Sequence, residues 1–161
     1  MQIYLDHSAT TPPHPDVIAK LQGVLSDNWG NPSSLHAWGE RSATEIEMAR
    51  VETAQLINAE TPESIIFTSG GTEADNLALL GIADQYASPQ HLIISSVEHS
   101  AVEKTAQRLE AWGWEVTRLP VNQSGQVHPW DLDSAIQSNT VLVSIIYGQS
   151  EVGTLQPIAQ L

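Results

Sequence analysis

The 161-residue sequence contains no cysteine. The chain therefore has no disulfide framework, no thiolate metal site and no cysteine nucleophile of its own. Basic residues are also scarce, since six Lys and Arg stand against nineteen Asp and Glu, which gives a formal charge of −13. Nucleic-acid phosphates and anionic lipids would be repelled by such a chain, so we expect neither a nucleic acid nor a membrane as its partner.

Signals for export and membrane insertion are missing from the sequence as well. Residues 1–13 contain neither a basic segment nor an apolar run, so they do not resemble a secretory signal. No apolar stretch approaches the roughly 20 residues that a membrane-spanning helix needs. We therefore expect a soluble, cytoplasmic protein. Its 41% content of hydrophobic residues is enough to form a packed core and excludes a disordered tail.

After residue 60, short β-branched or aromatic runs alternate with patterns typical of helices. Strands are predicted at Ser64–Thr68, His91–Ser95, Glu115–Leu119 and Val141–Tyr147. Helices are predicted between them at 72–86, 100–112 and 130–137. This alternation requires crossover connections and favours a mostly parallel sheet with helices on both faces. The predicted fold class is therefore α/β, with three layers in the order helices, sheet, helices (αβα).

The first 60 residues have a different pattern. Residues 1–15 are predicted to be extended and residues 16–60 mainly helical, and residues 61–161 carry the α/β part. No linker divides these parts, so we expect a single domain over 1–161. Pro157 is followed by good helix formers, which predicts the first turn of a helix that the sequence does not continue. We therefore expect this domain to be incomplete.

One candidate binding site is the turn Thr68-Ser69-Gly70-Gly71-Thr72-Glu73. Its glycines allow a ligand to approach the backbone, and the following helix offers unpaired N–H groups and the positive end of its dipole. The turn has neither the Walker pattern nor the dinucleotide fingerprint. Two interpretations remain open: a phosphate site with the Thr72 hydroxyl as a donor, or a tight turn in which Thr72 is the N-cap of the helix.

His99 is a second candidate, because it follows a predicted strand and precedes a helix in which Ser100 and Glu103 have capping-box spacing. Ligands of open α/β sheets bind at this carboxyl edge of the sheet. A loop histidine that faces solvent remains the alternative interpretation. The six histidines show no metal-binding spacing, so no metal site is predicted.

The segment 147–153 follows the last predicted strand and superficially resembles a serine nucleophile elbow. Val152 occupies the position where that motif requires its second glycine, so a serine hydrolase is not expected. We instead expect the segment to present polar side chains to the same edge of the sheet.

Four segments resemble, in order, signatures of the cysteine desulfurases, a branch of the class-V aminotransferase group. They are Tyr4–Pro12, Gly30–Gly39, Ile66–Asn76 and Val97–Val102. This resemblance covers essentially the whole chain and implies the N-terminal part of the large domain of a transferase that depends on pyridoxal 5′-phosphate. Such enzymes remove sulfur from L-cysteine, giving L-alanine and an enzyme persulfide that supplies iron–sulfur cluster assembly. The resemblance also implies a homodimer, or self-association, and an iron–sulfur scaffold or other sulfur acceptor as partner.

The resemblance also implies roles for individual residues. Gly71 and Thr72 would hold the cofactor phosphate. His99 would stack on the pyridine ring and assist proton transfer, which makes it the candidate catalytic residue. Ala9 and Thr10 would lie near the substrate.

The sequence departs from the family pattern in two ways. Gln149-Ser150-Glu151 replaces the usual Asn-Asn-Glu, so Ser150 would make a weaker contact with the phenolic oxygen of the cofactor. The Schiff-base lysine, the aspartate partner of the pyridinium and the persulfide cysteine of the family are not among these residues. The only lysines, Lys20 and Lys104, lie outside any family lysine motif.

Three hypotheses follow from the resemblance. In the first, the chain is part of a cysteine desulfurase and is inactive by itself. In the second, it is a half-length relative that acts as an interaction or regulatory module. In the third, it belongs to another class-V enzyme such as a selenocysteine lyase. Because the missing half of the domain would supply further strands to the sheet, we expect the chain to have an exposed apolar surface and to self-associate.

Overall fold

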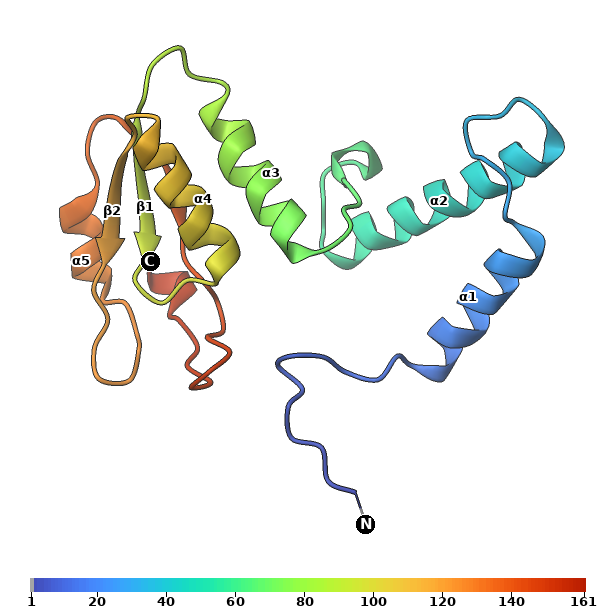
Figure 1. The fold of residues 1–161 in the computed structure, drawn as a ribbon, viewed down its shortest axis with the longest axis horizontal. Coiled ribbons are helices and arrows are strands. Elements are labelled where there is room, and N and C mark those ends of the chain that lie inside the picture. Colours follow the sequence, from blue (N-terminus) through green and yellow to red (C-terminus); the bar gives the residue numbers. More distant parts are fainter. Residues whose placement is uncertain (1) are drawn as a thin grey trace. The chain divides into compact units, whose positions relative to one another are not determined.

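The computed structural model describes residues 2–161, and the chain forms two compact units, Met1–Phe67 and Thr68–Leu161. In Figure 1 the first unit is coloured blue to cyan and the second green to red. None of the helices in the described part of the chain is long and apolar enough to cross a membrane.

The first unit is mainly helical. It contains α1 (Pro15–Asp27), α2 (Ala37–Leu56) and a 3₁₀ helix, η1 (Pro62–Ser64). The sequence predicts residues 16–60 to be mainly helical, and α1 and α2 make up most of this range. Histidines cap them: Nδ1 of His14 accepts from the backbone N–H of Asp16 at 3.3 Å, and Nδ1 of His36 accepts from that of Gly39 at 3.2 Å.

Two glycines allow the chain to turn tightly into α2. A Cβ atom added at Gly30 would lie 2.3 Å from the backbone oxygen of Trp38, and one added at Gly39 would lie 2.2 Å from that of Ser34. Because both neighbours are backbone atoms that a rotamer change cannot move, any larger residue would force the loop apart. The 30–39 segment is therefore a closely packed corner.

The strand predicted at Ser64–Thr68 is wrong. Residue 64 ends η1 and the backbone of Ile65 is extended, but no other described segment pairs with residues 65–68 as a strand. The guanidinium of Arg50 donates instead to the carbonyl oxygen of Ile65 and lies 5.2 Å from the ring centre of Phe67. Ile66 and Phe67 are exposed. The β-branched pattern was present, but a strand also needs a neighbour that exchanges hydrogen bonds with it.

The second unit contains a three-stranded parallel sheet. Its strands are β1 (His91–Ser95), β2 (Glu115–Leu119) and β3 (Thr140–Ser144), in the order β2-β1-β3. The parallel sheet is confirmed, but β3 ends three residues before the predicted Tyr147. Beyond Ser144 the backbone takes other partners, because the N–H of Ile146 donates to the Glu98 side chain.

Helices cover both faces of this sheet, as the sequence predicts. The helices α3 (Gly71–Ala83) and α4 (Ser100–Ala111) lie on one face and α5 (Pro129–Ala135) on the other (Figure 1). Alternation along β1 determines the two cores: Leu92 and Ile94 pack with α3 and α4, while Ile93 packs with Leu132 of α5. All three side chains are fully buried.

Residues 158–160 form a single 3₁₀ turn, η2 (Ile158–Gln160), in place of the expected first turn of an α-helix. Just before it, Gln156 is almost completely buried. Its side-chain oxygen accepts from the backbone N–H of Val127 at 2.8 Å, and its amide group donates to the carbonyl oxygen of Gly125 at 2.7 Å. This side chain therefore fastens the 122–127 turn to the end of the chain.

Replacing Gln156 with Ala is expected to lower the free energy of unfolding by about 2 kcal/mol, because the buried N–H of Val127 then loses its acceptor. Urea denaturation of the two proteins measures this difference. Gln126→Ala is the matched control, since the Gln126 side chain is exposed and donates to the carbonyl oxygen of Leu155. A cost for Gln156→Ala no larger than that of the control would contradict the role assigned to this residue.

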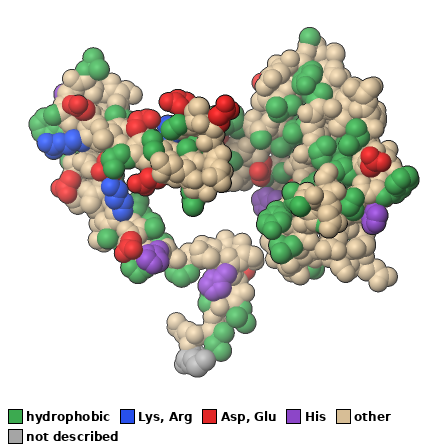
Figure 2. Space-filling view, turned by 180° about the vertical axis from the view of Figure 1, so that it is seen from behind, with side chains coloured by type: hydrophobic (Ala, Val, Ile, Leu, Met, Phe, Trp, Pro, Cys, Tyr) green, Lys and Arg blue, Asp and Glu red, His purple; other side chains and the backbone are tan. Residues whose placement is uncertain are grey.

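Hydrophobic side chains are visible on the surface of each unit in Figure 2. In the second unit the exposed ones include Leu77, Trp130, Tyr147 and Val152, with 48%, 68%, 65% and 71% of their surface accessible. Exposed apolar residues are what the sequence predicts for this chain. Self-association through them stays a prediction.

Candidate functional site

The glycine turn leads directly into α3. Gly70 is the N-cap of this helix and supplies no side-chain bond, so the interpretation with Thr72 as N-cap is wrong. The carboxylate of Glu73 accepts from the backbone N–H of Ser69 at 2.6 Å and from its hydroxyl at 2.7 Å. These two bonds lower the pKa of Glu73, the hydroxyl having the larger effect. Glu73 thus fixes the shape of the turn from one side.

The rest of the turn is open. The backbone N–H groups of Gly71 and Thr72 donate to no acceptor among residues 2–161, and both residues are exposed. A Cβ atom at Gly70 or Gly71 would meet no atom within 4 Å. Free N–H groups at the start of a 13-residue helix attract an anion, and a side-chain hydroxyl adds a donor. The residues present therefore fit a phosphate group.

His99 is the N-cap of α4. Its Nδ1 accepts from the backbone N–H of Ala101 at 3.1 Å. The predicted capping box of Ser100 and Glu103 is wrong, because the Glu103 carboxylate binds the guanidinium of Arg118 instead, at 2.9 Å. While Nδ1 accepts this bond, the proton of the neutral imidazole is on Nε2. The ring of His99 is exposed and presents an N–H donor to its surroundings.

The glycine turn and His99 lie at the same end of the second unit. The first residues of α3, the first residues of α4 and the carboxyl end of β1 all lie at the lower end of this unit in Figure 1. Asn76 joins the two helices there: its amide group donates to the carbonyl oxygen of Thr72 at 2.8 Å, and its oxygen accepts from the hydroxyl of Thr105 at 2.9 Å. Both candidates therefore belong to one edge of the sheet.

A hairpin follows β3 and carries Ser150. Its strands are joined by a bridge between Gly148 and Leu155. The side-chain oxygen of Gln149 accepts from the backbone N–H groups of Glu151 and Val152, each at 2.7 Å, so it stabilises its own turn. Ser150 is exposed at the tip of this hairpin.

The proposed substrate residues belong to the first unit. The backbone N–H groups of Ala9 and Thr10 both donate to the carbonyl oxygen of Asp6, at 3.2 and 3.4 Å. The hydroxyl of Tyr4 donates to the carbonyl oxygen of Thr10 at 3.2 Å. Ala9 and Thr10 are thus held in a compact exposed turn, and their position near a substrate stays a prediction.

Comparison with known proteins decides the family. The family model of the class-V aminotransferases matches residues 3–161, nearly the whole chain. The chain belongs to the class-V aminotransferase family. It is 44% identical over 161 residues to the cysteine desulfurase IscS of Dictyoglomus turgidum, and 44% identical over 160 residues to that of Methanosarcina thermophila. Each alignment covers 99% of this chain but only 41% and 39% of those proteins. The chain therefore spans about two fifths of the length of the curated relatives that it matches.

Solved structures agree with this membership of the class-V family. A NifS-like protein superposes with a TM-score of 0.94 at 32% identity, covering 99% of this chain and 44% of that one. SspA, solved in complex with cysteine, superposes with a TM-score of 0.92 at 37% identity, covering 98% of this chain and 45% of that one. The αβα fold is thus the fold of a pyridoxal-phosphate-dependent transferase, as the sequence predicts.

Neither lysine of this class-V chain belongs to the glycine turn. Lys20, on α1 in the first unit, pairs through its ammonium group with the carboxylate of Glu45. Lys104 is an exposed residue in the second turn of α4. No group of three or more metal-ligating side chains occurs among the described residues.

Glu98 is a residue of this edge that the sequence patterns do not single out. This half-buried residue directly precedes His99, and its Oε1 accepts from the hydroxyl of Ser95 and from the backbone N–H of Ile146, each at 2.6 Å. Burial raises the pKa of Glu98, and the negative charge of Asp75 adds to this effect, while the two hydrogen bonds oppose it. A carboxylate between a buried strand and a candidate histidine was the signal that could have pointed to it.

The raised pKa of Glu98 predicts how stability changes with pH. A carboxyl group with a raised folded-state pKa contributes stability that is full below its ordinary value of 4.5 and is lost as the pH rises through the folded-state value. Glu98→Gln is therefore expected to gain stability relative to the wild type as the pH rises from below 4.5 towards neutrality. Urea denaturation across this range measures the difference, and a difference that does not change with pH would contradict the prediction.

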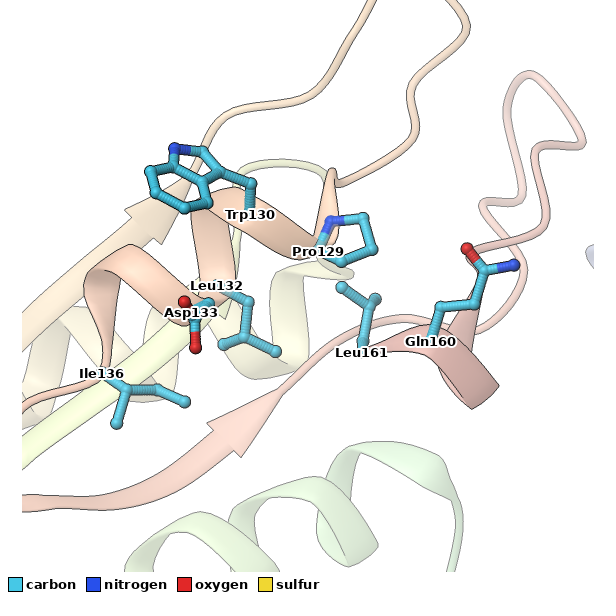
Figure 3. A pocket seen from close by; sticks show the side chains of 7 residues that line it. All are labelled: Pro129, Trp130, Leu132, Asp133, Ile136, Gln160 and Leu161. Atoms are coloured by element: carbon cyan, nitrogen blue, oxygen red, sulfur yellow. The ribbon is translucent and has the colours of Figure 1, made fainter.

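A cavity of about 360 Å³ lies on the α5 side of the unit. Figure 3 shows the residues that line it: Pro129, Trp130, Leu132, Asp133, Ile136, Gln160 and Leu161. None of the predicted site residues is among them. The cavity lies on the opposite face of the sheet from α3 and α4. The candidate site is therefore the carboxyl edge of the sheet, at the starts of these two helices, and not this cavity.

Proposed function

We propose that the chain carries the phosphate-binding end of the active site of a cysteine desulfurase, with pyridoxal 5′-phosphate as cofactor and L-cysteine as substrate. The observation that carries this proposal is the start of α3, where the N-cap Gly70 supplies no side-chain bond and the N–H groups of Gly71 and Thr72 are free to receive a phosphate. The similarity to curated cysteine desulfurases supports the same chemistry.

Each residue has a defined part in this proposal. The N–H groups of Gly71 and Thr72, with the Thr72 hydroxyl, hold the phosphate at the positive end of α3. His99 lies against the cofactor ring as the catalytic residue and offers its Nε2–H for proton transfer. Ser150 makes the weaker polar contact at the hairpin tip, and Ala9 and Thr10 border the substrate. The cofactor, when bound, supplies the electron sink of the reaction.

The remaining groups come from polypeptide outside these residues. The sequence has no cysteine to carry sulfur, and neither lysine belongs to the glycine turn. We therefore propose that residues 1–161 form one incomplete domain that is inactive alone. The proposal further includes a cytoplasmic location, a homodimer, and an iron–sulfur scaffold or other sulfur acceptor as partner.

Binding of pyridoxine 5′-phosphate tests this proposal, because this analogue lacks the aldehyde that reacts with lysine. Gly71→Ala is expected to weaken binding about tenfold, since a methyl group then occupies the space that the phosphate approaches. Thr72→Val is expected to weaken it about threefold through loss of one hydroxyl donor. Calorimetry measures the dissociation constants.

Gly81→Ala is the matched control for Gly71→Ala. It lies in the same helix with the same open space around it, and alanine favours a helix at both positions. We expect this control to bind like the wild type. Equal binding by the wild type and Gly71→Ala would contradict the proposed phosphate site.

A non-catalytic interaction module is the second candidate, and the exposed hydrophobic residues of the second unit favour it. This candidate predicts association of the chain without any affinity for pyridoxine 5′-phosphate. Because both candidates include self-association, the calorimetric titration with pyridoxine 5′-phosphate separates them, and the oligomeric state does not.

A further inference from the structure

Glu98 links the ends of β1 and β3 beyond the last residues that pair in the sheet. The paired residues of β1 and β3 end at Ile94 and Ser144. Beyond this point a single atom, Oε1 of Glu98, accepts from Ser95 on the β1 side and from Ile146 on the β3 side, each at 2.6 Å. Ser95 is fully buried, so one of the two partners belongs to the rigid core.

This connection joins the two loops that carry candidate site residues. His99 directly follows Glu98, and the hairpin that begins at Tyr147 directly follows Ile146. His99 is also held on its other side, because its Nδ1 accepts from the N–H of Ala101 in α4. The imidazole is thus fixed between a helix cap and the Glu98 bonds, and neither depends on a ligand.

The chemistry of the bonds shows which feature of Glu98 matters. Both donors use Oε1, and neither bond requires a negative charge. A glutamine oxygen can accept the same two bonds, whereas alanine removes both and leaves the Ile146 N–H without its acceptor. Burial also raises the pKa of this group, so a carboxylate is held here despite a cost in solvation.

We propose that Glu98 is a positioning residue, which ties the His99 loop to the end of β3 and so holds the imidazole where it meets the cofactor ring. This role rests on the proposed function. Without the Glu98 bonds, the loop would keep its helix cap but lose its fixed distance to the hairpin, and stacking of His99 on a ring would weaken. The phosphate turn belongs to α3 and would not be affected.

The test compares two ligands. Inorganic phosphate reports on the α3 turn alone, and pyridoxine 5′-phosphate reports on the turn together with the ring. The ratio of their affinities measures the ring contribution. In Glu98→Ala this ratio is expected to fall about fivefold, to the value of His99→Ala, since one aromatic contact is lost. The affinity for inorganic phosphate is expected to stay unchanged.

Two variants separate positioning from general damage to the fold. Glu98→Gln is expected to restore the wild-type ratio, because its oxygen accepts the same bonds. Glu103→Ala removes a different carboxylate, which binds Arg118 from the same helix as the His99 cap, and is expected to leave the ratio unchanged. Ser95→Ala removes one of the two Glu98 bonds and is expected to give an intermediate ratio, so it serves if Glu98→Ala does not fold.

NMR of the ligand-free chain supplies a readout that is independent of the proposed function. In Glu98→Ala the His99 ring signals are expected to shift and the Ile146 amide to exchange faster with solvent, and Glu98→Gln is expected to reverse both changes. Unchanged His99 signals, or an equal loss of affinity for both ligands, would overturn the role of Glu98. A wild-type chain that binds the two ligands equally would instead overturn the proposed function, and the His99 signals would still decide the role of Glu98.

Discussion

Supplied with pyridoxal 5′-phosphate and L-cysteine, the 161-residue chain is expected to release no alanine above the uncatalysed background. The reaction needs a lysine to hold the cofactor and a thiolate to accept sulfur, and the chain has no cysteine. The expected loss is therefore the whole enzymatic acceleration, at least about 10⁶-fold. Alanine and sulfide assays of the purified chain measure it.

Lys104→Ala is the control for this expectation. Lys104 lies in the second turn of α4 and not in the glycine turn, so with one equivalent of pyridoxal 5′-phosphate wild type and variant are expected to show the same absorbance. Absorbance of lysine-bound pyridoxal that disappears in the variant would contradict the placement of Lys104 away from the site. Alanine release that depends on L-cysteine would contradict the larger claim that these residues are catalytically incomplete.

His91→Ala is expected to lower the free energy of unfolding by about 3 kcal/mol, because it removes two hydrogen bonds and leaves a cavity. His91 is the first residue of the central strand, and its side chain is fully buried. Its Nδ1 bonds the hydroxyl of Thr140 on β3 at 2.7 Å, and its Nε2 bonds the hydroxyl of Thr117 on β2 at 2.8 Å. Urea denaturation measures the cost.

His128→Ala is the matched control for this substitution. His128 is exposed and caps α5, with its Nδ1 accepting from the N–H of Trp130 at 3.1 Å. Loss of one cap is expected to cost about 1 kcal/mol. Equal costs for the two histidines would show that His91 does not hold the three strands together.

Prediction from the sequence succeeded for elements that a local pattern determines. It failed where an element depends on a distant or unusual bonding partner. The runs at 91–95 and 115–119 are strands because each one has a parallel neighbour. Residues 64–68 have the same kind of pattern but no neighbour among the described residues, and their exposed Ile66 and Phe67 show the consequence. Propensity alone does not distinguish these two situations.

The N-caps of the helices show a second limit of prediction from the sequence. The usual capping residues are Ser, Thr, Asp and Asn, so Ser100 and Thr72 were the natural candidates. The structure uses His99 and Gly70 instead. A histidine cap depends on the rotamer that brings Nδ1 to the N–H groups, which the sequence pattern does not contain.

The candidate site was predictable in its order along the chain but not in its connections. A glycine turn before a helix and a histidine after a strand are both visible in the sequence, and parallel strands bring such segments to one edge. The bonds of Glu98 to Ser95 and Ile146 join residues up to 48 positions apart. Such a contact follows only from the three-dimensional arrangement.

Residue-resolved NMR titration of the chain with pyridoxine 5′-phosphate tests the central claim most directly. The account predicts that the largest shifts occur at the amides of Gly71 and Thr72 and at the ring of His99, with smaller shifts at Ser150. Shifts confined to the cavity beside α5, at Trp130 and Leu132, would contradict it, as would a spectrum that the ligand leaves unchanged.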